Sequence, residues 1–144
     1  MKIRAVLTVL VCNTLAFLLM SVAGFLIVRF APWGHMAADL TRLQPAQLAA
    51  KYGNPVALLQ RGVFYQIWIL GPCFALALGA VAAVMFGRCD WRISTLSVVI
   101  LVVASAAPTS LAGSLAACLY IVASWLAMKL VSMWLPPSAS RPSG

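Results

Sequence analysis

The sequence predicts an all-α membrane protein, a four-helix transmembrane bundle with both termini on the cytoplasmic side. Of its 144 residues, 64% are hydrophobic and 8% are charged, whereas a soluble globular domain is about half apolar and about one quarter charged. The apolar residues also form long uninterrupted runs. A helix needs roughly 20 consecutive apolar residues to cross the hydrocarbon layer, and these runs suffice for four crossings.

The apolar run at residues 5–28 predicts the first span. It follows the basic segment "MKIR" and ends at "RFAPWG", where Trp33 suits the membrane interface. A cleaved signal peptide is the alternative, because "SVAG" at 21–24 resembles a cleavage site of small residues. The run continues through Val28, which makes it longer than the apolar core of a typical signal peptide. We therefore expect a retained span.

The last apolar run, from Ile93 to Leu135, predicts two spans joined by a tight turn. As one helix it would be about 65 Å long, against about 30 Å of hydrocarbon. The stretch "APTSLAG" supplies a proline, two hydroxyl side chains that can cap a helix, and a glycine. We therefore predict a turn within 108–113. The expected single domain, 1–135, has its spans at about 5–28, 63–86, 93–109 and 112–135.

The distribution of basic residues predicts the topology, because lysine and arginine favour the cytoplasmic ends of membrane helices. With four spans, one face of the membrane receives Lys2, Arg4, Arg88, Arg92 and Arg141. The other face receives four basic residues, but they are spread from Arg29 to Arg61 around a longer loop. This pattern favours N-in and C-in, and a location in the cell membrane, specifically a bacterial inner membrane.

The loop at 31–62 is the one sizeable segment expected outside the bilayer. Spacing of three and four residues predicts a short amphipathic helix, with an irregular loop as the alternative; its apolar positions are Leu40, Leu43, Ala46 and Ala50. Asn54 and Pro55 form a good helix start and predict a second helix that continues into span two. The final segment, 136–144, reads "PPSASRPSG" and is expected to be a disordered tail.

Small residues recur at every fourth position of span two and predict a helix-packing interface. Residues of this size let another helix backbone approach closely; they are Gly71, Ala75, Gly79 and Ala83. The stripe packs either against the chain's own bundle or against another protein. Asn13 interrupts span one, and we expect its amide to bond to a neighbouring helix, because hydrocarbon offers it no partner.

Three basic residues are candidates for contact with lipid or a partner. Lys129 lies inside the fourth apolar run, where its side chain can extend to the cytoplasmic headgroups or meet an acidic group of a partner subunit or a lipid phosphate. Arg88 and Arg92 lie in the short inner loop, where we expect them to contact headgroups.

The residues that usually carry chemistry are too few and too scattered for catalysis. Asp39 and Asp90 are the two acids and both lie outside the apolar runs; the four cysteines form no C-x-x-C pair, and His35 is the one histidine. We therefore predict no enzyme activity, no cofactor and no metal. The basic residues do not form a patch, so nucleic acid is not an expected partner.

The expected partners are the lipid bilayer and other membrane subunits, or further copies of the chain. The favoured hypothesis is a structural or accessory subunit of a larger membrane complex, held by helix packing. Two alternatives are a small self-assembling channel or transporter, and a membrane protein that binds and neutralises a toxin through the 31–62 loop.

Overall fold

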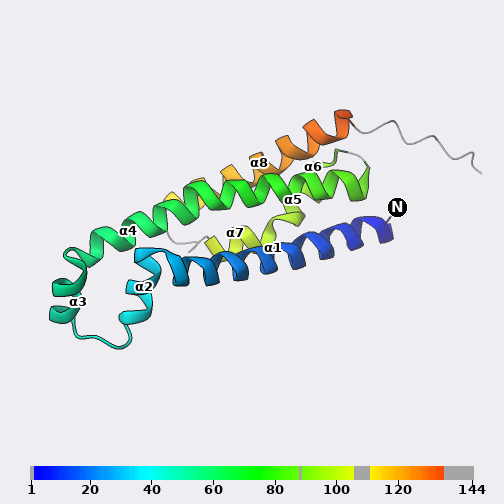
Figure 1. Cartoon of the computed structure of the whole chain (residues 1–144). Helices are drawn as coiled ribbons and strands as arrows, with labels where there is room; N and C mark the ends of the chain where they lie inside the picture. The colour runs from blue at the N-terminus through cyan, green and yellow to red at the C-terminus, as the bar shows by residue number, and fades with distance from the viewer. Residues whose placement is uncertain (1, 88, 106–110, 135–144) are drawn as a thin grey trace, which may run out of the picture. The chain divides into compact units, whose positions relative to one another are not determined.

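The computed structural model describes residues 2–87, 89–105 and 111–134, and their regular structure is helical throughout (Figure 1). The prediction of an all-α protein is therefore confirmed. The elements are α1 (Lys2–Phe30), α2 (Pro32–Asp39), α3 (Pro45–Tyr52), α4 (Pro55–Tyr65), the π-helical turn η1 (Gln66–Leu70), α5 (Gly71–Phe86), α6 (Trp91–Ser97), α7 (Val99–Ser105) and α8 (Leu111–Trp134).

Three helices of the described chain are long and apolar enough to cross a membrane, namely Ile3–Phe30, Pro55–Phe86 and Ala112–Trp134. The second of these joins α4, η1 and α5 without a gap. The π-helical turn lies just before Pro72, whose missing N–H removes a bond from the ladder. Helices of this length and composition are those of a multi-pass membrane protein.

The described part of the third predicted span, residues 93–105, belongs to two short helices. The chain leaves helical geometry at Val98, with φ −112° and ψ 9°, between α6 and α7. From Trp91 to Ser105 the two helices rise about 22 Å, less than the roughly 30 Å of hydrocarbon. The predicted turn at 108–113 and the tail at 136–144 fall largely or wholly outside the described residues.

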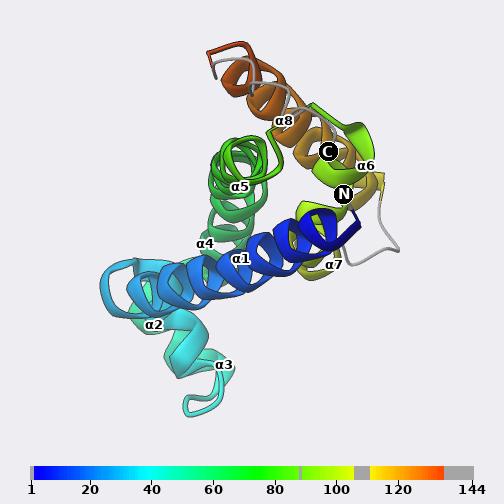
Figure 2. The same cartoon turned by 90° about the vertical axis from the view of Figure 1, so that its right-hand side faces the viewer.

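The chain divides into two compact units, residues 1–17 with 71–144, and residues 18–70. In the first unit, α5 packs along α8, and α6 and α7 pack on both of these helices. Figure 2 shows α8 with α5 on one side and α6 on the other. The core of this unit contains the fully buried Leu78, Tyr120 and Met128.

The second unit contains the helices of the predicted outer loop. Pro32 starts α2 and forces Ala31 into an extended conformation, φ −94° and ψ 137°, which ends α1 at Phe30. The predicted amphipathic helix through Leu40 and Ala50 is wrong in its bounds. Pro45 starts a new helix, α3, so residues 40–44 connect two helices instead of continuing one.

The helix start predicted at Asn54 and Pro55 is confirmed. The Asn54 side chain accepts a hydrogen bond from the N–H of Ala57, at 3.1 Å, and Pro55 occupies the first position of α4. The asparagine side chain satisfies a backbone N–H that would otherwise stay unpaired. Proline at the first helical position has no N–H to satisfy.

Candidate helix-packing site

The small residues of α5 lie on the buried side of the helix. Gly71, Ala75, Gly79 and Ala83 are all buried. A Cβ atom at Gly79 would overlap the backbone carbonyl of Ser124 on α8, and a Cβ at Gly71 would overlap the ring of Tyr120. At these two glycines, the stripe therefore packs against the chain's own α8.

Two buried serines connect α8 to α6 beside this contact. The Ser94 hydroxyl donates to the Ser124 hydroxyl at 3.0 Å, and Ser124 donates to the Ser94 carbonyl at 3.3 Å. Neither residue is exposed. Ser124 therefore meets Gly79 through its backbone and Ser94 through its side chain, so α5, α6 and α8 converge at one residue. Sequence reasoning missed this pair, although both serines interrupt apolar runs.

Asn13 lies on α1 and bonds to both sides of the break between α6 and α7. Its Nδ2 atom donates to the carbonyl of Leu96 at 2.8 Å and to that of Val9 at 2.8 Å. Its Oδ1 atom accepts from the N–H of Ile100 at 3.1 Å. All of the hydrogen-bonding atoms of the amide are therefore used.

The position of this amide explains how the broken helix is tolerated. In an unbroken helix the N–H of Ile100 would bond to the carbonyl of Leu96, four residues earlier. The Asn13 amide bonds to both of these groups and so is inserted into the helical ladder. Lipid offers no partner for freed backbone groups, and a side chain inserted in this way is a recognised cause of a helix break.

The hydroxyls of α6 favour the same break. Ser97 donates to the carbonyl of Ile93 at 2.7 Å, and Thr95 donates to that of Trp91 at 2.9 Å. Hydroxyl groups that bond back to the preceding turn bend helices slightly. Asn13 was expected from sequence to bond to another helix, but the break that it fills was not expected.

The described residues that were candidates for contact with lipid or a partner lie on two different helices. Lys129 is exposed on α8, with Nζ 5.1 Å from the centroid of the Trp125 ring. Arg92 is exposed on α6, 5.7 Å from the Trp91 ring. Arg88 lies outside the described residues. Both described cations lie beside aromatic rings, an arrangement worth about 0.5–1 kcal/mol at exposed sites.

A charged cluster in the second unit ties α2 to α3. Asp39 accepts hydrogen bonds from Lys51 at 2.6 Å and from the Tyr52 hydroxyl at 2.8 Å. These two bonds, Lys51 first, lower the pKa of Asp39, and the bond to Asp39 raises the pKa of Lys51. Among the described residues, no three histidine, cysteine or acidic side chains gather as a metal site would require.

No protein family, no curated protein and no solved structure matches this chain.

Proposed function

We propose that this chain is an accessory subunit of a larger inner-membrane complex and that it binds its partner through the outer face of α8. The single observation that carries the proposal is the division of α8 into two faces. One face is buried and includes Ala116, Tyr120 and Ser124. The opposite face consists of exposed residues, here called the outer face: Leu115, Leu119, Val122, Leu126, Lys129 and Met133.

The spacing of the outer face supports a helical partner. Successive members lie four and three residues apart in alternation, which is the seam spacing of two helices in left-handed contact. Large apolar side chains on such a seam also suit lipid, so the apolar residues alone do not distinguish lipid from protein. Lys129 favours a protein partner, because it places in the same seam a cation that an acidic side chain of a partner helix can pair with.

An acidic side chain would stabilise the cation of Lys129, but both acids of this chain are already paired elsewhere. The sequence contains two acids, and both have partners: Asp39 bonds to Lys51, and Asp90 caps the start of α6 through the N–H of Arg92. A cation within a membrane segment pairs with an acid where one is available. A partner helix with an aspartate or glutamate at the level of Lys129 fits this face.

Site-specific photo-crosslinking in native membranes tests the proposal. A photoreactive residue replaces Val122 on the outer face, and the matched control replaces Val84, an exposed valine on α5. We expect a discrete protein adduct from position 122 and none from position 84. Adducts with lipid alone at both positions, or the same protein adducts at both, would contradict the proposal. In the Lys129→Met variant, the adduct at 122 should become weaker.

A transporter is the second candidate, because a broken helix at membrane depth is typical of transporter binding sites. In such sites the freed backbone groups bind substrate or ion. Here the carbonyl of Leu96 and the N–H of Ile100 bond to Asn13 instead, which favours the accessory role. Solute or ion flux from the purified chain in liposomes would reverse this preference.

A further inference from the structure

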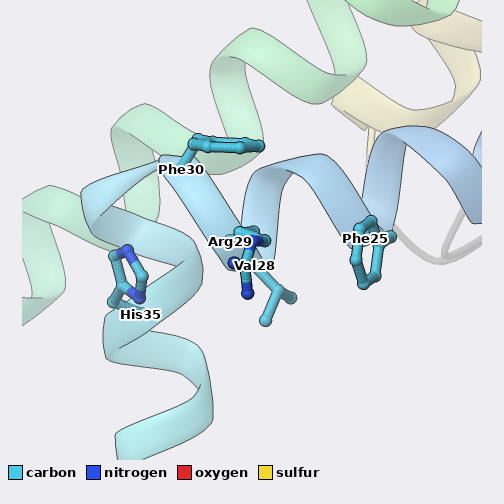
Figure 3. A pocket seen from close by; sticks show the side chains of 5 residues that line it. All are labelled: Phe25, Val28, Arg29, Phe30 and His35. Carbon is cyan, nitrogen blue, oxygen red and sulfur yellow. The ribbon is translucent and has the colours of Figure 1, made fainter.

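An open pocket lies where α1 ends and α2 begins, within the second unit. It measures about 420 Å³ and is lined by Phe25, Val28, Arg29, Phe30 and His35. Figure 3 shows Phe25, Val28 and Arg29 along α1 and His35 on the adjoining α2. Pockets that bind small ligands measure about 300–1,000 Å³, so this one can hold a headgroup-sized ligand.

The connection between the two helices places Arg29 and His35 on the lining of the same pocket. Val28 and Arg29 follow Phe25 by three and four residues, so both lie on the side of α1 that carries Phe25. Gly34 then lets α2 fold back, because a Cβ at Gly34 would overlap the carbonyl of Ile27. This close approach brings the next residue, His35, beside the end of α1.

The charge of the pocket favours an anion. Arginine presents several N–H donors in a planar fork that matches two oxygens of a phosphate, and histidine adds a further N–H. Asp39 is the one acid in residues 18–70, and Lys51 and Tyr52 already hold its carboxylate. No carboxylate in this described unit is therefore left to compete for Arg29.

The apolar residues that line the pocket favour a lipid over a soluble anion. Phe25 is 66% exposed and Val28 is 49% exposed, and they precede Arg29 on a helix that is long and apolar enough to span the membrane. Four residues correspond to about 6 Å along the helix axis. The cation thus lies at the end of the apolar segment, with uncovered apolar surface on the membrane side, where the acyl chains of a lipid begin.

We propose that this pocket binds the phosphate of an anionic phospholipid, with Arg29 and His35 as donors and with Phe25 and Val28 against the upper acyl chains. An anionic headgroup fits better than phosphatidylcholine, whose quaternary ammonium would place a further cation beside Arg29. Free phosphate shares the donor chemistry but makes no use of the apolar walls. The proposal does not depend on the accessory role of α8.

Native mass spectrometry of the full chain in detergent tests the proposal. The probes are palmitoyl-oleoyl phosphatidylglycerol, the corresponding phosphatidylcholine, and inorganic phosphate. The variants are Arg29→Gln, Arg29→Lys and His35→Gln, and the control is Arg42→Gln, which removes an exposed cation of the same unit outside the pocket. Circular dichroism checks that each variant keeps its helix content.

We expect phosphatidylglycerol to bind the native chain and the Arg42→Gln control equally. Loss of a charge-assisted hydrogen bond should weaken binding at least about tenfold in Arg29→Gln, less in His35→Gln, and by an intermediate amount in Arg29→Lys. Equal binding of phosphatidylglycerol by Arg29→Gln and the control would overturn the proposal. Displacement of the lipid by millimolar inorganic phosphate, or equal affinity for phosphatidylcholine, would overturn the choice of an anionic lipid.

Discussion

At the scale of single residues, Asn13 has the clearest structural consequence. Its amide satisfies a donor and an acceptor that belong to one helix, and it does so from a different helix. A residue in this position fixes the break at Val98, and it also fixes the register of α1 against α6 and α7. Its effect on stability is therefore expected at the upper end of the range for a polar contact between helices, which is typically worth about 0.6–2 kcal/mol.

Replacing Asn13 by leucine should lower the free energy of unfolding by about 2 kcal/mol, because two backbone groups lose their partner in a low-dielectric region. Asn13→Asp should lower it as well, since a carboxylate accepts from Ile100 but, when ionised, donates nothing to Leu96. The control is Thr14→Val, because the Thr14 hydroxyl bonds to Leu10 within its own helix. Unfolding in mixed micelles measures the difference, and equal values for Asn13→Leu and Thr14→Val would contradict the role assigned to the amide.

Asp39 provides a pH-dependent contact at the same scale. Because its folded pKa lies below the ordinary value of 3.8, the stability from the α2–α3 cluster is present above pH 3.8 and is lost as the pH falls through the folded pKa. The carboxyl carbon of Asp39, followed by NMR, should titrate below 3.8, and its midpoint should rise in Lys51→Met. An unchanged midpoint in that variant would show that Lys51 does not cause the shift.

At the scale of helices, the α5–α8 contact depends on the absence of a side chain at Gly79. Gly79→Ala should lower the free energy of unfolding by about 1–3 kcal/mol, the usual effect of overpacking, because the new Cβ meets a backbone carbonyl that cannot rotate away. Gly24→Ala is the matched control, since a Cβ there has nothing within 4 Å. It should be neutral or stabilising by up to about 1 kcal/mol. Equal losses for both would mean that α5 and α8 do not touch at Gly79.

The sequence predicted helices where length and apolarity decide the structure, and it missed features that depend on pairing between distant residues. The long runs around Asn13 and Gly79 predicted α1, α5 and α8, because in lipid a helix satisfies its own backbone. The break at Val98 has only a weak local signal, the hydroxyls of α6, because it depends mainly on a side chain on α1. The three- and four-residue spacing alone predicts one helix through Leu40 and Ala50, but Pro45 starts a new helix, which sets the bounds of α2 and α3.

At the scale of the whole molecule, the number of membrane crossings depends on α6 and α7. The three long helices of the described chain would leave the start of α1 and the end of α8 on opposite faces of the membrane. The predicted four crossings place them on the same face. The two short helices rise about 22 Å, whereas the hydrocarbon layer is about 30 Å thick. They complete a crossing only if the difference is supplied by the residues that follow or removed by local thinning of the bilayer.

Labelling with a membrane-impermeant maleimide decides between three and four crossings. In a chain without its four native cysteines, Ile3→Cys and Met133→Cys place single thiols at two exposed positions near the ends of α1 and α8. We expect both to be protected in intact cells and labelled after lysis, because basic residues favour cytoplasmic termini. Ala49→Cys, exposed on α3, is the control and should be labelled from outside. Labelling of Met133→Cys together with Ala49→Cys, with Ile3→Cys protected, would mean that α6 and α7 enter the membrane and do not cross it.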